Sequence, residues 1–140
     1  MLAAGQATRF GGPKLLADFR GRPLLSHPLE VLAQAQRAGL ISKVVVVLPA
    51  GGRELAALSQ DLGAEPVHHT DPLPSLNSSI RLGLRAATGY DAALLVLGDQ
   101  PLLRIDAVER ILHAAGRYPD AVVRASYASD PAVPGHPVVV

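Results

Sequence analysis

Two cations in a glycine-rich stretch of the sequence have the chemistry needed to bind phosphate. Arg9 and Lys14 belong to AAGQATRFGGPK, which also contains Gly5, Gly11 and Gly12. Glycines allow successive backbone N–H groups to approach an anion, and cations beside them add charge to that cradle. Arginine can make a forked contact with phosphate, whereas lysine acts as a point charge. The same composition also suits a surface turn with solvated cations, and both interpretations stay open at this point.

Two familiar phosphate-binding motifs are excluded for this stretch. Pro13 separates the glycines from Lys14, and Leu15 stands where a Walker loop has Ser or Thr. Ala7 and Phe10 occupy two of the glycine positions of the GxGxxG fingerprint. Phosphate binding here would therefore follow a different pattern.

Asp99, in LVLGDQP, is the candidate metal ligand. It follows an apolar run that is typical of a buried strand, so its carboxylate would be held at the end of a rigid element. Mg²⁺ favours one or two protein carboxylates together with substrate phosphate oxygens. The alternative is a turn-forming aspartate ahead of Pro101.

The stretch DPLPSLNSSIRLG contains a third set of polar side chains. Its serines lie where we expect a helix to start, and the free N–H groups and dipole of a helix start attract anions. Ser79 and Arg81 could contact phosphate or sugar, while Asn77 or Ser78 would cap the helix. Asp71 is either a second carboxylate near the metal or the start of an Asp-Pro turn.

Three of the five histidines lie close to expected strands. His68 and His69 are adjacent, so in a strand they face opposite sides and cannot easily share one metal ion. A structural role is therefore favoured over a metal site for HHTD. His136 stands between a glycine and a proline ahead of an expected strand, where its ring would face a pocket. No serine has the sequence context of a nucleophile elbow.

These loops alternate with segments of regular hydrophobic pattern. We expect helices at 23–39, 53–63, 77–89 and 105–116, and strands at 43–48, 65–69, 92–98 and 121–126, with another beginning at 135. Continuous apolar strands are typical of parallel sheets that are buried on both faces. The alternation then predicts a mostly parallel sheet between two helix layers, which is a three-layer α/β/α domain. Ligands of such sheets bind beyond the carboxyl ends of the strands, where the polar loops lie.

The composition is that of one globular domain covering residues 1–140. Thirteen Lys and Arg against twelve Asp and Glu leave a net charge of +1, which excludes a broadly basic surface for nucleic acid. The absence of cysteine excludes disulfides and thiolate chemistry. No apolar run could span a bilayer and no signal peptide is recognisable, so we expect a cytoplasmic location. Because the chain starts at the glycine turn and stops within GHPVVV, we also expect that a first strand and some C-terminal structure are missing.

The quoted stretches resemble a known family along the whole chain. LAAGQATRFGGPK resembles LAAGxSxRxGxxK, the opening signature of the nucleotidyltransferases that act on molybdenum cofactor. The wider superfamily includes sugar-phosphate nucleotidyltransferases and the cytidylyltransferase of isoprenoid synthesis. Four further stretches each resemble a segment of the family. GRPLLSHPLEVL resembles GxPLLxH, and DPLPSLNSSIRLGLRAA resembles NPxxxxGxxxSLRxGLxA. LVLGDQPLL resembles LxDQP, and PGHPVVV resembles GHPxLF. The isoprenoid enzyme would carry HDAxRP in place of GDQP, and Ser75 stands where the family usually has Gly.

The resemblance implies a Rossmann-like, MobA-like NTP transferase domain and a reaction. The domain would move a nucleotidyl group onto the phosphate of molybdopterin or its metal-bearing form, with release of pyrophosphate. LAAG rather than LAGG is similar to members that use CTP rather than GTP. The implied cofactor is Mg²⁺, and the implied partners are CTP or GTP, molybdopterin and a molybdoenzyme that receives the product. Neither nucleic acid nor membrane is an implied partner.

The resemblance also implies roles for individual residues. Arg9, Lys14 and Asp99 would be catalytic, with Asp99 holding Mg²⁺. The nucleotide would be bound by these three residues together with Leu2, Ala3, Ala4, Gly5 and Ser79. The acceptor side would be lined by Asp71, Arg81 and His136. The alternatives are a sugar-phosphate or other small-phosphate nucleotidyltransferase and a nucleotide-binding domain without turnover.

Overall fold

The computed structural model describes residues 1–5, 13–72, 74–127 and 130–140. The helices in these ranges are α1 (Ser26–Arg37), α2 (Arg53–Asp61), α3 (Leu76–Ala86) and α4 (Ile105–Arg117), preceded by a 3₁₀ turn, η1 (Lys14–Leu16). The strands are β1 (Asp18–Phe19), β2 (Arg22–Pro23), β3 (Val45–Leu48), β4 (Glu65–His68), β5 (Leu94–Leu95), β6 (Val123–Tyr127) and β7 (Asp130–Val139). All four expected helices are present, with ends shifted by up to three residues. None of the helices in the described ranges has the length and apolar character needed to cross a membrane.

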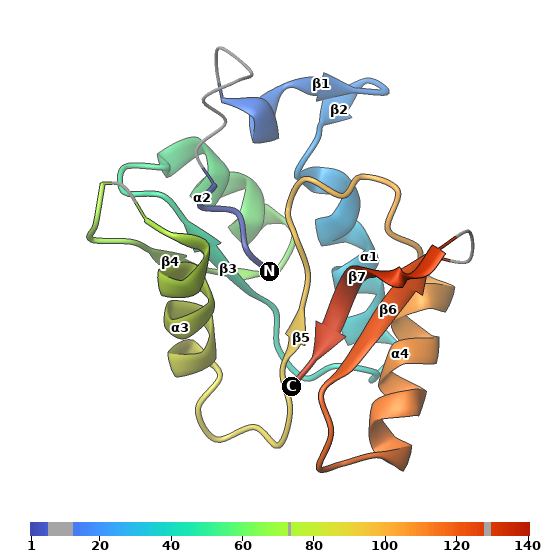
Figure 1. Ribbon diagram of the computed structural model, residues 1–140. Coiled ribbons are helices and arrows are strands. Elements are labelled where there is room, and N and C mark those ends of the chain that lie inside the picture. The colour runs from blue at the N-terminus through green and yellow to red at the C-terminus, as the bar shows by residue number, and fades with distance from the viewer. Residues whose placement is uncertain (6–12, 73, 128–129) are drawn as a thin grey trace.

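The strands form three hydrogen-bonded groups. β3 and β4 pair in parallel, β5, β7 and β6 pair antiparallel in that order, and β1 and β2 form a separate hairpin (Figure 1). Residues 1–4 run between the first two groups, because Leu2 forms parallel bridges with Val47 in β3 and with Leu97 just after β5. The spatial order is therefore β4, β3, residues 1–4, β5, β7 and β6.

The main chain of residues 1–4 is hydrogen bonded on both sides. Leu2 N donates to Val96 O at 2.8 Å, and Ala3 N donates to Val47 O at 2.8 Å. Val47 N in turn donates to Met1 O at 2.9 Å. This short segment thus joins the two strand groups into one continuous layer.

Side chains alternate along this segment and along β3, so both faces of the layer are buried. On one face, α1 and α2 cover a cluster that includes Met1, Ala3, Val46 and Leu48. On the other face, the side chains of Ile80 and Leu82 in α3 cover Leu2, Ala4 and Val47. Figure 1 shows α3 on one side of the strands, with α1 and α4 on the other. The expectation of an α/β fold with helices on both faces is confirmed.

The expectation of a mostly parallel sheet is wrong for the second half of the chain. β7 is antiparallel to both β5 and β6. Only two residues separate the end of β6 from the start of β7, and parallel neighbours need a crossover of a dozen or more residues. The strand expected at 92–98 is also shorter, because only Leu94 and Leu95 pair with β7 as a ladder. The β1–β2 hairpin was not predicted, although its turn contains Gly21 with a positive φ of 83°.

Gly98 allows the segment after β5 to pack closely against residues 1–4. Its N–H donates to Leu2 O at 2.9 Å, and a Cβ at this position would lie 2.9 Å from Leu25 Cδ1 and 3.1 Å from Ala3 Cβ. We expect Gly98→Ala to lower the free energy of unfolding by about 1–3 kcal/mol, since the added methyl overpacks the core. Urea denaturation measures this change. The matched control is Gly116→Ala in α4, where the added Cβ meets no atom within 4 Å and should stabilise the helix. Equal losses at both positions would contradict the steric explanation.

Candidate functional site

A cavity of about 420 Å³ opens at the edge of the sheet where residues 1–4, β3 and the segment after β5 end. This volume lies in the range of small-molecule sites. The cavity is lined by residues 2–5, Lys14, Ser79 and Asp99, together with prolines and leucines from the neighbouring loops and from the first turns of η1, α2 and α3. Because residues 1–4, β3 and the β5 segment run in parallel, their carboxyl ends bring the following loops to one edge.

Seven of the eight residues expected to bind nucleotide line this one cavity: residues 2–5, Lys14, Ser79 and Asp99. The eighth, Arg9, lies outside the described residues, as do Gly11 and Gly12. Pro49 and Pro74 also line the cavity and were not predicted. The sequence could have indicated these two prolines, because they lie in the loops that follow β3 and β4.

Lys14 and Asp99 form an ion pair at the cavity. The Lys14 Nζ to Asp99 Oδ2 distance is 2.8 Å, and the two side chains are 36% and 44% exposed. Such partly exposed pairs contribute about 0–1 kcal/mol to stability, so little free energy opposes their separation. A bound phosphate could therefore replace Asp99 as the partner of Lys14, and the carboxylate of Asp99 could then bind a cation.

Ser79 projects from the first turns of α3 and is held by a buried histidine. His69 Nε2 lies 3.0 Å from Ser79 Oγ, and the two residues are 7% and 5% exposed. The neighbouring His68 is exposed, so the expectation that the two rings face opposite sides is confirmed. His69 was not predicted as a site residue, because its contact with Ser79 depends on how α3 packs beside β4.

The start of α3 differs from the expected cap. Ser75 is the capping residue, and its Oγ accepts a hydrogen bond from Ser78 N at 3.1 Å. Ser75 has extended backbone angles, φ −79° and ψ 162°, which place its side chain over the first turn. Asn77 and Ser78 already belong to the helix, so the expectation that one of them caps it is wrong.

The three residues expected on the acceptor side do not line this cavity. Asp71 and Arg81 are exposed, in the loop after β4 and on α3 respectively. His136 is half-buried in β7, and its Nδ1 is buried without a hydrogen-bond partner in the described part of the chain. The structure therefore brings the expected nucleotide residues together but not the expected acceptor residues.

Asp99 is the carboxylate of the cavity that could hold a divalent cation. Within the described ranges, no group of three or more His, Asp or Glu side chains is arranged to hold a metal. A cation at Asp99 would need further oxygen ligands from a bound phosphate and water, which suits Mg²⁺. The site fits a metal that binds together with a nucleotide rather than a metal held by the protein alone.

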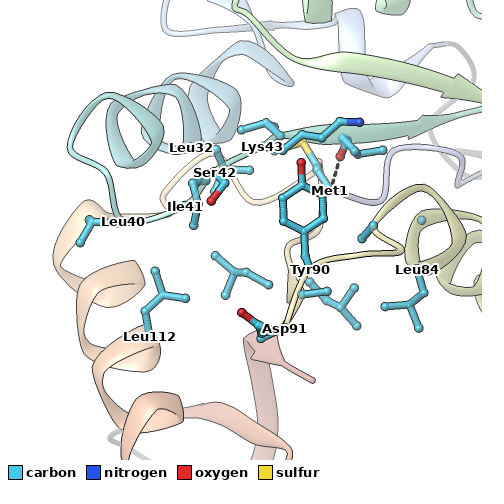
Figure 2. A pocket seen from close by; sticks show the side chains of 18 of the residues that line it. Met1, Leu32, Leu40, Ile41, Ser42, Lys43, Leu84, Tyr90, Asp91 and Leu112 are labelled. Atoms are coloured by element: carbon cyan, nitrogen blue, oxygen red, sulfur yellow. Dashed lines mark hydrogen bonds between the residues drawn. The ribbon is translucent and has the colours of Figure 1, made fainter. Parts of the chain in front are cut away.

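A second cavity, of about 280 Å³, lies at the opposite edge of the sheet and has a different character. Figure 2 shows Leu32, Leu40, Ile41 and Leu112 on one side of it, across from Tyr90 and Leu84. Lys43 at its rim is paired with Glu65, the Nζ–Oε2 distance being 2.6 Å. This largely apolar cavity lacks the phosphate-binding features of the first.

The ammonium of Met1 lies at the wall of the second cavity and donates to Val45 O at 2.6 Å (Figure 2). Burial lowers the pKa of this group from its ordinary 8.0 to about 5. Between pH 5 and pH 8 the unfolded chain therefore binds a proton that the folded chain does not. The free energy of unfolding should rise as pH increases through this window.

We accordingly expect the Tm of the 140-residue chain to be several degrees higher at pH 8 than at pH 5.5, measured by calorimetry. Acetylation of the Met1 amine removes the titrating group and should remove most of the difference. An unchanged pH slope after acetylation would exclude Met1 as its source.

The fold agrees with what comparison with known proteins finds. The chain belongs to the MobA-like NTP transferase domain family, whose sequence profile matches residues 1–140.

The chain is similar to three curated relatives and matches only part of the length of each. It is 30% identical to the bifunctional protein GlmU of Bartonella quintana over 94% of its own length and 29% of that protein. It is 33% identical to nicotine blue oxidoreductase of Paenarthrobacter nicotinovorans, over its whole length and 68% of that protein. It is also 33% identical to 2-C-methyl-D-erythritol 4-phosphate cytidylyltransferase of Streptomyces avermitilis, over 96% of the chain and 58% of the relative. The chain thus spans less than two thirds of the first and third of these relatives.

A solved structure with the same fold is Rv0371c from Mycobacterium tuberculosis H37Rv. It is 28% identical, with a TM-score of 0.78, and the match covers 99% of this chain and 67% of that one. A second crystal structure of Rv0371c is a complex with manganese, at 27% identity and a TM-score of 0.70 over 99% and 66% of the two chains. A protein similar to this chain therefore binds a divalent cation.

Proposed function

We propose that this chain transfers CMP from CTP to the terminal phosphate of molybdopterin or its metal-bearing form, releasing pyrophosphate. The observation that carries the proposal is the ion pair of Lys14 and Asp99, 85 residues apart in sequence, at a cavity lined by residues 2–5. Membership of the NTP transferase family supports nucleotidyl transfer. The stretches LAAG and GDQP favour CTP and the molybdopterin acceptor.

The proposed reaction requires alignment of two polyanions. An oxygen of the acceptor phosphate forms a bond to the α-phosphorus of CTP, and the bond from that phosphorus to the pyrophosphate oxygen breaks. The attacking oxygen is already an anion, so no general base has to remove a proton. The site must instead orient the reactants and neutralise their charge.

Different residues of the cavity would orient the reactants and neutralise their charge. N–H groups of the glycine-rich stretch after Ala3 would face the nucleotide, because those of Leu2 and Ala3 are bonded within the sheet. Ala3 and Ala4 would lie beneath the base. Lys14 would exchange Asp99 for phosphate oxygens and offset charge that develops on the α-phosphate and the leaving pyrophosphate. Arg9 is proposed as a second cation, and Asp99 as the ligand of Mg²⁺. That cation, when bound, neutralises phosphate charge and orients the phosphate oxygens.

We retain Asp71, Arg81 and His136 as proposed acceptor-side residues. Since they do not line the nucleotide cavity, the acceptor would extend beyond it along the surface. A sugar phosphate or another small phosphate is the second candidate acceptor, because one relative is named as a cytidylyltransferase of 2-C-methyl-D-erythritol 4-phosphate. GDQP in place of HDAxRP is the reason to prefer molybdopterin over the isoprenoid acceptor.

Thermal unfolding with CTP and with GTP, each with and without Mg²⁺, tests the nucleotide part of the proposal. We expect CTP with Mg²⁺ to raise the Tm most, and ligand at a hundred times its Kd adds about 2.7 kcal/mol of stability. Pyrophosphate release with molybdopterin, compared with release in the presence of sugar phosphates, then tests the acceptor. Binding of CTP without pyrophosphate release from any acceptor would support the binding-domain alternative. No response to any nucleoside triphosphate would overturn the proposal.

A further inference from the structure

A buried histidine stands behind the candidate site and has no role in the chemistry described so far. His69 directly follows β4 and is 7% exposed. Its Nε2 lies 3.0 Å from the Oγ of Ser79, which lines the cavity. The ring therefore reaches the site through one hydroxyl group.

The main-chain oxygen of Ser75 limits what the Ser79 hydroxyl can do. It accepts from Ser79 N at 3.0 Å and from Ser78 Oγ at 2.8 Å. A carbonyl oxygen has two lone pairs, and these two donors fill them. Ser79 Oγ also donates to this oxygen, at 3.1 Å, and is a third donor that the carbonyl does not need. Because Ser75 O keeps two other donors, the hydroxyl hydrogen of Ser79 can turn to a ligand oxygen without leaving that carbonyl unpaired.

The direction of the hydrogen bond between His69 and Ser79 decides where that hydrogen points. If Ser79 donated to Nε2, its oxygen would present only lone pairs to the cavity, and these would repel the oxygens of a triphosphate. If Nε2–H donates to Ser79, the hydroxyl hydrogen is free to meet an oxygen of the ligand. A cavity that binds a polyanion therefore requires that Nε2–H of His69 donates to Ser79.

We propose that His69 is a positioning residue: it donates its Nε2–H to Ser79 and so directs the Ser79 hydroxyl toward an oxygen of the bound nucleotide. This inference rests on the proposed function. The oxygen belongs to a phosphate or to a carbonyl of the base, both of which are acceptors. Chains of hydrogen bonds also polarise one another, so the His69 contact strengthens Ser79 as a donor.

The tautomer of His69 can be tested without any nucleotide. Two-bond ¹H–¹⁵N correlation spectra of the free protein distinguish a protonated from an unprotonated ring nitrogen. We expect Nε2 of His69 to carry the proton. An unprotonated Nε2 would overturn the inference and would leave the proposed function intact.

Variants then test whether the contact acts on nucleotide binding. We expect His69→Leu to raise the KM for CTP about tenfold with kcat little changed, because the hydrogen bond from Ser79 to the nucleotide loses its orientation. His69→Gln can place an N–H near the Nε2 position and should recover most of the affinity. His113→Leu makes the same change at an exposed position of α4 and should have no effect.

Ser79→Ala should weaken CTP binding by the same factor as His69→Leu. The double variant should be no worse than either single one, because the two side chains act in series. Additive losses in the double variant, or failure of His69→Gln to rescue, would show that His69 does not act through Ser79.

Inorganic tripolyphosphate identifies the oxygen that Ser79 meets. If Ser79 donates to a phosphate oxygen, His69→Leu weakens tripolyphosphate and CTP binding alike. If it donates to the base, only CTP binding weakens. If the variant weakens neither, the inference fails, whereas wild-type protein that binds neither ligand would instead count against the proposed function.

Discussion

Asp99→Asn is expected to abolish metal-dependent nucleotidyl transfer, a loss of at least about a hundredfold in kcat. Asp99 is the acidic residue that lines the proposed nucleotide cavity, and the described ranges contain no group of three or more acidic or histidine side chains arranged to hold a metal. Asparagine keeps the shape of the side chain but removes the negative charge that Mg²⁺ requires. Pyrophosphate release measured across a range of Mg²⁺ concentrations tests the prediction.

Stability provides the check that Asp99→Asn has not simply unfolded the protein. The variant loses the ion pair to Lys14, which is partly exposed, so the free energy of unfolding should fall by less than about 1 kcal/mol. Asp120→Asn, an exposed position outside the cavity, is the matched control and should retain full turnover. Undiminished metal dependence in Asp99→Asn would remove this residue from the mechanism.

Lys14→Ala is expected to lower kcat by about two orders of magnitude. The lysine is already placed at the cavity by η1 and by its 2.8 Å contact with Asp99, so it has only to exchange this partner for a phosphate oxygen to offset charge in the transition state. Its removal also leaves the carboxylate of Asp99 without its cation. Steady-state kinetics with CTP and the acceptor measure the loss.

The sequence contains one other lysine, and it makes a clean control. Lys43 pairs with Glu65 and lies at the rim of the second cavity, at the opposite edge of the sheet. Lys43→Ala should therefore leave kcat unchanged, although it also removes a positive charge. A similar decrease in both variants would indicate an effect of net charge rather than a local contact by Lys14.

The proximity of Lys14 and Asp99 could be predicted from the sequence, because each residue follows a segment that belongs to the same layer of parallel strands. Continuous apolar runs predict buried strands, and parallel strands place the loops at their carboxyl ends together. The same reasoning failed for the chain after α4. There it predicted parallel pairing, but the two-residue connection between β6 and β7 permits only an antiparallel neighbour.

Features that depend on how helices and strands pack against one another could not be predicted from the hydrophobic pattern or from motif spacing. The contact of His69 with Ser79 needs α3 to lie against β4, and no spacing in the sequence sets that distance. The cap of α3 was assigned two or three residues too late, because three of the four residues from Ser75 to Ser78 can cap a helix. The residues expected on the acceptor side lie in segments that resemble the family, but they do not line the cavity beside Lys14 and Asp99.

The backbone pairing of residues 1–4 has a consequence for how the protein moves. Amide protons of Leu2 and Ala3 are bonded to strands on opposite sides, and both residues are buried. Their exchange with deuterium should require opening of the whole layer rather than local fraying. The floor of the candidate cavity should therefore be among the slowest-exchanging parts of the fold, and we expect any adjustment to different ligands to occur in the loops around it.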